Sequence, residues 1–204
     1  MKIIDVSSLA IPEIKVVRFK RFTDERGYFT ETYRESDLSN IIADFKIKQI
    51  NESKSQKGAL RGLHAQWDPY MGKLVRTVYG HMVDLVLDIR LNSPTFGKII
   101  AYDMPTNPQQ EFDTWIWIPV GFVHGNFYLE DSAIEYLCTD EYNPQGEVTI
   151  NPLSEDLDWS LTVSSIKNKF DQLITSHQYI QSPKDKQGLT LKQWLNSNNK
   201  DLFK

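Results

Sequence analysis

The sequence predicts an all-β fold of the sandwich, barrel or jelly-roll type, with short helices at its periphery. Through residue 153, short runs of β-branched and aromatic residues follow one another, and Gly, Pro and Asn separate them. Many short strands with turn signals between them are typical of these antiparallel folds. Helical spacing is found mainly in the last fifty residues.

The stretch 83–89, VDLVLDI, shows the strand pattern most clearly. Its odd-numbered residues are apolar and share one face, while Asp84 and Asp88 share the other face with Val86. A face with this mixed polarity fits either solvent or the interior of a barrel. The other predicted strands are KVVRF (15–19), KLVRTVYG (73–80), GKIIAYDM (97–104), TWIWIPV (114–120), NFYL (126–129) and AIEYL (133–137).

Three segments have the spacing of helices. Amphipathic helices are predicted for ESDLSNIIADF at 35–45 and for SSIKNKFDQLI at 164–174. A third, shorter helix is expected to begin near Thr190, where LKQWL follows with apolar residues at i, i+3 and i+4 spacing. Helical segments therefore lie mostly toward the C-terminus.

The composition fits a single domain. The chain has 204 residues, of which 40% are hydrophobic and 12% aromatic, so it can bury one sizeable core. It contains no internal repeat, low-complexity tract or Gly/Ser linker. We expect one domain over residues 1–204, in which a β core at 1–153 is covered by a helical segment at 154–204.

The charges bear on the partners of the protein. The 23 basic and 27 acidic residues are interspersed and give a net charge of −4, so we expect neither nucleic acid nor a membrane as a partner. The stretch MKIIDVSSLAIPEIK lacks the apolar run of a signal peptide or membrane span, and we expect a cytoplasmic protein. The lone Cys138 cannot form an internal disulfide and is expected in the core or on a strand.

Two histidines lie in motifs that raise the question of a metal site. The metal-binding jelly rolls known as cupins typically use two His and a Glu from one strand pair, with a further His from a Pro-x-Gly-x-x-His turn. That turn is present at 119–124 and ends in His124, but the first half reads His64-Ala-Gln66, with Lys73 nearby. Gln is a weak ligand for Zn or Fe, and an ammonium group repels a divalent cation. We therefore expect no metal; the alternative without chemistry is that both histidines are satisfied core residues.

The same residues suit proton transfer at carbon. A carboxylate beside His64 would fix the tautomer of the imidazole and leave its other nitrogen as a base near neutral pH. Removing a proton next to a ketone creates an enolate, whose negative oxygen Lys73 could stabilise. Tyr136, on a predicted strand, could return a proton from the opposite face.

Seven motifs in order through the first 153 residues resemble the family of dTDP-4-dehydrorhamnose 3,5-epimerases, which are cofactor-free nucleotide-sugar epimerases of the cupin fold. The resemblance implies an all-β cupin double-stranded β-helix, or jelly roll, and no cofactor. The motifs are FTDERGYFTE (22–31), QINES (49–53), GALRGLHAQ (58–66), GKLVR (72–76), DLVLDIRLNSPTFG (84–97), WIPVGFVHG (117–125) and YLCTDEYNPQGE (136–147).

The resemblance also implies roles for individual residues. His64 corresponds to the general base and Tyr136 to the general acid, while Lys73 would neutralise the oxyanion at C4 and His124 would lie in the sugar pocket. Tyr142 corresponds to the aromatic residue that stacks on thymine, an interaction that suits a flat base. Other motif positions fall on the contacts to the nucleotide and the diphosphate, namely Arg26, Phe29, Glu31, Gln49, Asn51, Arg61 and Glu147. Members of the family pair their N-terminal strands across a two-fold axis, so the resemblance implies a homodimer.

Three departures from the family pattern affect the site. Ala65 stands where the family usually has an aromatic residue, and Asn126 interrupts the usual His-Gly-Phe. The phosphate-binding lysine and the aspartate that orients the base correspond to Lys184 and Asp185, although a predicted helix lengthens the segment before them. Asp84 is the alternative partner of His64.

The leading hypothesis is therefore an epimerase of a 4-keto-6-deoxy nucleotide sugar, most simply dTDP-4-dehydro-6-deoxyglucose, that acts at C3, C5 or both in the biosynthesis of deoxysugars and surface polysaccharides. One alternative is a 3,4-ketoisomerase or single-site epimerase of the same substrate class. The other is a protein that binds nucleotide sugars without catalysis.

Overall fold

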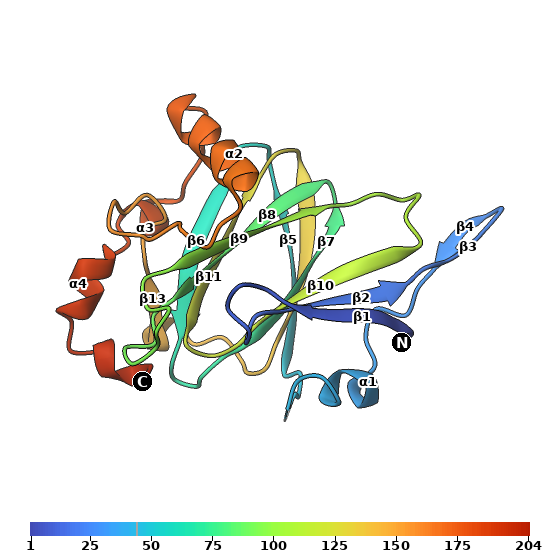
Figure 1. Cartoon of the computed structure of the whole chain (residues 1–204), viewed down its shortest axis with the longest axis horizontal. Helices are drawn as coiled ribbons and strands as arrows, with labels where there is room; N and C mark the ends of the chain where they lie inside the picture. The colour runs from blue at the N-terminus through green and yellow to red at the C-terminus, as the bar shows by residue number, and fades with distance from the viewer. Residues whose placement is uncertain (44) are drawn as a thin grey trace.

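The computed structural model describes residues 1–43 and 45–204, and in it two antiparallel β-sheets lie face to face (Figure 1). The larger sheet has the order β1 (Ile3–Ser8), β2 (Lys15–Lys20), β10 (Phe112–Ile118), β7 (Lys73–Tyr79), β12 (Ser132–Cys138) and β5 (Gln49–Ser55). The smaller sheet has the order β13 (Glu147–Thr149), β6 (Leu60–Gln66), β11 (Phe122–Tyr128), β8 (His81–Asp88) and β9 (Ile99–Pro105).

The chain passes from one sheet to the other at nearly every turn between β5 and β13, which is the winding of a jelly roll. This winding pairs strands that are distant in sequence, such as β11 with β6 and β12 with β5. The all-β prediction is confirmed. A short hairpin of β3 (Phe22–Asp24) and β4 (Gly27–Phe29) projects away from the body of the molecule (Figure 1).

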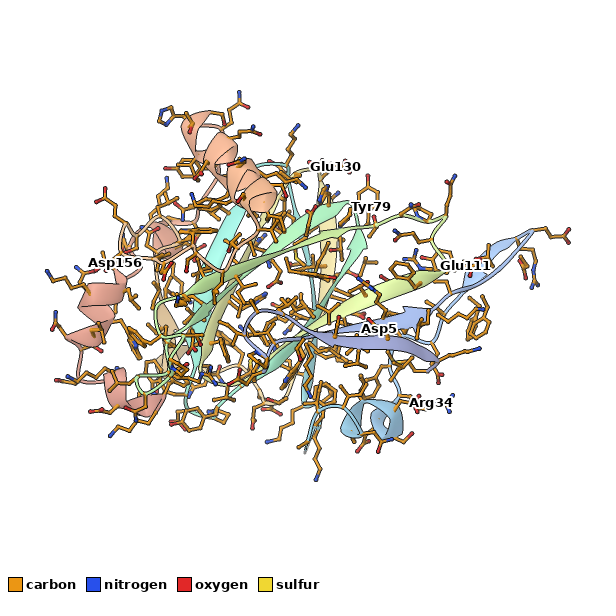
Figure 2. The ribbon with its side chains drawn as sticks, in the orientation of Figure 1. Asp5, Arg34, Tyr79, Glu111, Glu130 and Asp156 are labelled. Atoms are coloured by element: carbon orange, nitrogen blue, oxygen red, sulfur yellow. The ribbon has the colours of Figure 1, made fainter. Side chains whose placement is uncertain are left out.

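The mixed face of β8 turns out to be the interior of the sandwich. Asp84 and Asp88 are fully buried, and Val86 belongs to the hydrophobic cluster between the sheets with Ile116 and Phe122. The opposite face of β8, which includes Leu85, packs in a second cluster with residues of the C-terminal segment. Both faces of β8 are therefore covered, and side chains pack along the strands of both sheets (Figure 2).

The C-terminal segment covers the smaller sheet with helices α2 (Ser164–Thr175), α3 (Pro183–Lys186) and α4 (Leu191–Leu195) and the short 3-10 helix η2 (Lys200–Leu202) (Figure 1). The predicted helix at 164–174 is confirmed. Phe170 of α2 is buried against Phe127 of β11, with ring centroids 5.6 Å apart. The helix near Thr190 also forms, because the Thr190 and Gln193 side chains make a reciprocal capping box.

Two sequence predictions on element bounds were wrong, and one short helix was not predicted. The helix expected at 35–45 is only α1 (Glu35–Ser39), which has no side-chain cap at its N-terminus; residue 44 of the predicted helix lies outside the described residues. Strand β11 begins at Phe122 rather than at residue 126, so His124 lies within a strand. Helix α3 was not predicted, because its single turn is too short to show periodicity. A further 3-10 helix, η1 (Pro144–Gly146), precedes β13.

No helix in the described part of the chain is both long enough and apolar enough to cross a membrane.

Candidate active site

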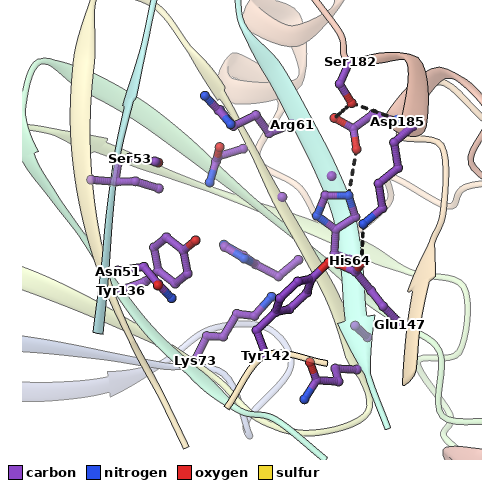
Figure 3. A pocket seen from close by; sticks show the side chains of 18 of the residues that line it. Asn51, Ser53, Arg61, His64, Lys73, Tyr136, Tyr142, Glu147, Ser182 and Asp185 are labelled. Atoms are coloured by element: carbon purple, nitrogen blue, oxygen red, sulfur yellow. Dashed lines mark hydrogen bonds and ion pairs between the residues drawn. The ribbon is translucent and has the colours of Figure 1, made fainter. Parts of the chain in front are cut away.

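A cavity of about 650 Å³ lies between the two sheets and is closed on one side by the C-terminal segment (Figure 3). Strand β6 supplies Arg61 and His64 to its wall, and the facing strands β7 and β12 supply Lys73 and Tyr136. The cavity gathers most of the residues singled out in the sequence: Gln49, Asn51, Arg61, His64, Lys73, His124, Tyr136, Tyr142, Glu147, Lys184 and Asp185.

His64 forms a hydrogen bond with a carboxylate that lies 121 residues away in sequence. Its Nε2 is 2.7 Å from Oδ1 of Asp185, and the other carboxylate oxygen of Asp185 accepts a hydrogen bond of 2.8 Å from Ser182 (Figure 3). The Ser182 hydroxyl also caps α3 by accepting a hydrogen bond from the backbone N–H of Asp185. This bonding leaves Nδ1 of His64 as the ring nitrogen that can take a proton.

The Asp185 carboxylate is held in its charged form. Burial opposes its ionisation, but the hydrogen bonds from His64 and Ser182 outweigh burial and lower the pKa of Asp185 below its usual value. The alternative partner, Asp84, is engaged elsewhere: its Oδ2 lies 2.7 Å from Nε2 of His124. The structure therefore pairs Asp185, and not Asp84, with His64.

Tyr136 lies across the cavity from His64. It belongs to β12 of the larger sheet, whereas His64 belongs to β6 of the smaller sheet, and its phenol oxygen is directed into the cavity (Figure 3). Burial and the nearby Cys138 raise the pKa of the Tyr136 hydroxyl above its usual value. The phenol therefore keeps its proton at neutral pH and can donate it.

Lys73 brings a positive charge into the cavity next to buried groups. Burial lowers the pKa of its ammonium group, although the nearby Cys138, Glu147 and Asp84 favour the charged form. Burial raises the pKa of Asp84, against the opposing effects of His124 and Lys73. A lysine with a lowered pKa is a stronger acid, and one in a low-dielectric cavity stabilises a nearby negative oxygen more than one in water does.

One end of the cavity is suited to an aromatic and charged ligand group. Tyr142 is 51% exposed, its hydroxyl donates a hydrogen bond of 3.0 Å to Glu147, and its backbone N–H bonds to Gln49. The ammonium group of Lys184 pairs with the same carboxylate of Glu147. Gln49 in turn donates a hydrogen bond of 2.9 Å to Asn51, which lies beside Cys138.

Arg61 lies toward the other end of β6. Its Nε donates a hydrogen bond of 2.8 Å to Ser55, and a terminal nitrogen donates to the backbone carbonyl of Lys54 on β5. Along β6, His64 lies between Arg61 and Gln66. Gln66 is paired with Glu147 of the neighbouring strand β13.

Three residues from the first motif do not line the cavity of their own chain. Arg26 is highly exposed at the tip of the projecting hairpin and pairs with Asp24 at 2.6 Å. Phe29 is 69% exposed on the same hairpin. Glu31 contacts Arg34 and the N-terminal ammonium group. The hydrogen bonds from these two groups lower the pKa of Glu31 to about 2, and the bond from Arg34 has the larger effect.

The Ala65 position, where the family usually has an aromatic residue, contributes to the wall of the cavity. Ala65 packs in the hydrophobic cluster of the outer face of the smaller sheet with Leu63 and Val148. On a β-strand, successive side chains point to opposite faces, so its neighbour His64 faces the cavity while the Ala65 methyl group is directed toward the cluster. The exchange of an aromatic side chain for Ala65 therefore changes the packing on the outer face of this strand.

The structure also reveals cavity residues to which the sequence analysis gave no role in the site. Ser182 holds the Asp185 carboxylate, and Gln66 ties the cavity wall to neighbouring loops by donating hydrogen bonds of 2.9 Å to the carbonyls of Pro69 and Glu141. Gln181 lines the cavity from the C-terminal segment. The polar residues of loops show no periodicity, so only the fold could bring them here. Within residues 1–43 and 45–204, no group of three or more His, Cys, Asp or Glu side chains could hold a metal ion.

Fold and cavity together define a class of protein: a cupin-type jelly roll whose central cavity carries acid and base groups on its facing walls. Comparison with known sequences makes this specific. The sequence profile of the dTDP-4-dehydrorhamnose 3,5-epimerase family matches residues 8–193, and the chain belongs to that family.

Individual relatives agree with this assignment. The chain is 39% identical over 170 residues to a dTDP-4-dehydrorhamnose 3,5-epimerase of Neisseria gonorrhoeae, a match that covers 82% of the chain but only 51% of the relative. A second such epimerase, of Sinorhizobium fredii, is 41% identical over 141 residues, which is 68% of this chain and 70% of that protein. Among solved structures, dTDP-6-deoxy-D-glucose-3,5-epimerase of Legionella pneumophila in complex with dTDP-4-keto-L-rhamnose is 34% identical and has a TM-score of 0.80, covering 98% of this chain and 96% of the other.

Proposed function

We propose that the protein is an epimerase of a 4-keto-6-deoxy nucleotide sugar, with dTDP-4-dehydro-6-deoxyglucose as the simplest substrate. The observation that carries this proposal is the His64–Asp185 pair on one wall of the cavity with Tyr136 on the facing wall. Inversion at carbon needs a base on one face of the ring and an acid on the other, and this arrangement provides both.

In the proposed reaction, Nδ1 of His64 removes a proton from the carbon next to the C4 ketone. The electron pair moves into an enolate, and the imidazole becomes an imidazolium that the Asp185 carboxylate stabilises. Lys73 lines the same cavity, and its ammonium group would meet the negative charge on the C4 oxygen. No redox partner is needed, because the carbon skeleton is neither oxidised nor reduced overall.

Tyr136 then completes the inversion. Its phenol donates a proton to the same carbon from the opposite face, the ketone re-forms, and the proton on His64 is returned to solvent as the phenolate is reprotonated. The raised pKa of Tyr136 supports this role, because the hydroxyl is protonated when the enolate forms. The cycle can take place at C3, C5 or both, since both carbons adjoin the C4 ketone.

The nucleotide would occupy the end of the cavity formed by Tyr142, Glu147 and Lys184. A thymine base can stack on the exposed ring of Tyr142, and the Lys184 ammonium can contact the diphosphate. The relative from Legionella is described in complex with a dTDP sugar, which supports this choice of nucleotide.

A homodimer would explain the three residues that lie outside the cavity of their own chain. The edge strand β1 and the projecting hairpin expose apolar side chains, among them Ile4, Phe22, Tyr28 and Phe29. Such an unpaired edge is suited to pairing with another chain. We propose that a second copy places Arg26, Phe29 and Glu31 beside the nucleotide of its partner.

We also propose that the enzyme works in the cytosol. A nucleotide sugar is charged and cannot cross a membrane, so the enzyme must work in the compartment in which its substrate is made.

Incorporation of deuterium tests the proposed function directly. In heavy water, the purified protein should introduce one deuterium per sugar for each carbon that it inverts, as counted by mass spectrometry. Two deuterium atoms would indicate 3,5-epimerisation and one a single-site epimerase, while a product with its ketone moved to C3, seen by NMR, would indicate a ketoisomerase. No incorporation with any 4-keto nucleotide sugar would leave only the non-catalytic binding protein.

A further inference from the structure

Two side-chain amides that line the cavity have polar atoms without partners. Asn126 is 4% exposed and Gln181 is 8% exposed. Within the part of the chain that the structure describes, neither the Oδ1 acceptor of Asn126 nor the Nε2 donor of Gln181 forms a hydrogen bond. A buried polar group left in this state destabilises a protein by about 1–3 kcal/mol.

A third amide in the same cavity shows that the fold can satisfy such groups. Both ends of Gln66 are bonded: its nitrogen donates to the carbonyls of Pro69 and Glu141, and its oxygen accepts from the backbone N–H of Asn143 at 2.8 Å. Gln66 is therefore a structural amide. Asn126 and Gln181 differ from it in that the described part of the protein gives Asn126 Oδ1 and Gln181 Nε2 no hydrogen-bond partner.

The two amides flank the same part of strand β6. On one edge, Asn126 of β11 pairs opposite Arg61, and it shares a strand face with His124 two residues earlier. On the other edge, Ile180 bridges to Ala59 and its carbonyl accepts a hydrogen bond of 2.8 Å from Leu60. The backbones of residues 126 and 181 are thus about two strand spacings, or roughly 10 Å, apart across β6.

The chemistry of the two atoms identifies the group that would satisfy them. Asn126 needs a donor and Gln181 needs an acceptor, and a hydroxyl group is both. A phosphate oxygen would satisfy Gln181 but not Asn126, and an apolar substituent such as the C6 methyl group would satisfy neither.

On the basis of the proposed function, we propose that Asn126 and Gln181 bind a ring hydroxyl of the sugar, at C2 or C3, and so make the enzyme selective against deoxygenated 4-keto sugars. A site built to bond a hydroxyl rejects the analogue that lacks it, because the polar groups of the protein are then left unpaired. With one lost hydrogen bond to a neutral group, the selectivity should be about tenfold or more in kcat/KM.

Three dTDP-4-keto sugars separate the possibilities: the 6-deoxy sugar with both hydroxyls, its 2-deoxy counterpart and its 3-deoxy counterpart. For each, kcat/KM is measured by deuterium incorporation with the wild type and with Asn126→Leu and Gln181→Met, which remove the amides at nearly constant volume. The wild type should prefer the parent sugar over one of the two analogues by tenfold or more, and each variant should lose most of that preference by reacting more slowly with the parent alone. Gln178→Met removes an exposed amide from the same loop as Gln181 and should leave the preference unchanged.

The outcomes distinguish this proposal from the proposed function. An active wild type that does not discriminate against either analogue, or variants that keep the full discrimination, would overturn the role of the amides while leaving the epimerase intact. A wild type that exchanges deuterium with none of the three sugars would overturn both. Gln181→Met lies in a loop, so it keeps the test decisive if Asn126→Leu, on a central strand, does not fold.

Discussion

At the scale of single residues, two features place His64: its position on β6 directs the side chain into the cavity, and a hydrogen bond with Asp185 fixes the ring. The motif around residue 64 predicted a base, but the sequence left two candidates for its partner. Only the folded chain separates them, since Asp84 lies on β8, two strands away from β6, and bonds His124 on the intervening strand β11. A predicted role could thus be assigned from a motif, whereas a predicted contact could not.

Replacement of His64 should abolish turnover while leaving the nucleotide bound. His64→Ala removes the base, so kcat should fall on the order of a hundredfold to ten-thousandfold, with dTDP affinity measured by calorimetry changed little. The matched control is His81→Asn, because His81 also pairs with an aspartate, Asp103 at 2.6 Å, but does not line the cavity. Equal losses in the two variants would contradict the proposed role of His64.

Tyr136→Phe should separate proton removal from inversion. Without the phenol, His64 can still remove a proton and return one to the same face, so the substrate should take up deuterium without changing configuration. Mass spectrometry measures the exchange, and NMR coupling constants report the configuration. A variant that inverts its substrate at the wild-type rate would show that another group is the acid.

At the scale of elements, α3 connects the C-terminal segment to the catalytic strand. Its capping residue Ser182 and its buried Asp185 are both tied to His64 through the carboxylate. This turn of four residues has no periodicity that a sequence can show, in contrast to α2, whose apolar residues at helical spacing predicted it to within one residue. Strands β1, β5 and β6 were likewise not recognised as strands, because polar residues interrupt them at the sheet edges or face the cavity.

The Asp185 contact should make stability depend on pH in acid. Its pKa is lower in the folded chain than the value of 3.8 expected when unfolded, so the unfolded state binds the proton more tightly. Its contribution to the free energy of unfolding is therefore present above about pH 4 and is lost as the pH falls through the folded value. Urea titrations at pH 3 to 7 should show a smaller loss toward acid for Asp185→Asn than for the wild type, and parallel curves would contradict this.

The packing of α2 can be tested in the same way. Phe170 is 5% exposed and contacts Trp159, with ring centroids 4.7 Å apart, as well as Phe127. Phe170→Ala should lower the free energy of unfolding by about 3–5 kcal/mol, because it leaves a cavity under the helix. Val163→Ala, at a position that is 63% exposed beside the same helix, should change it by less than about 0.5 kcal/mol in urea titrations.

At the scale of the whole molecule, the jelly-roll class followed from the many short strands, but the pairing of those strands did not. Pairs such as β6 with β11 join segments about sixty residues apart, and no local pattern specifies them. The family resemblance supplied what local physics could not, namely which motifs meet in the cavity. It also placed Arg26, Phe29 and Glu31 with the nucleotide, although within one chain the hairpin carries Arg26 and Phe29 away from it.

Mixing two inactive variants tests whether a dimer shares its sites. Arg26→Ala and His64→Ala homodimers should each be weakly active, and after unfolding and refolding together in equal amounts about a quarter of wild-type activity should return. The reason is that half of the dimers are mixed, and in each of these one site contains neither substitution. If Arg26 serves the cavity of its own chain, every site in the mixture keeps a defect and no activity returns.

Asp185 lies beyond all the strands, and this position has a consequence for the newly made chain. During synthesis the strands that carry His64, Lys73 and Tyr136 leave the ribosome before Asp185, the proposed partner of the base. A partly synthesised or C-terminally clipped chain therefore has walls for a nucleotide sugar but no oriented base. If Asp185 has the proposed role, the order of synthesis would keep the proposed chemistry switched off until the segment that carries α3 has docked.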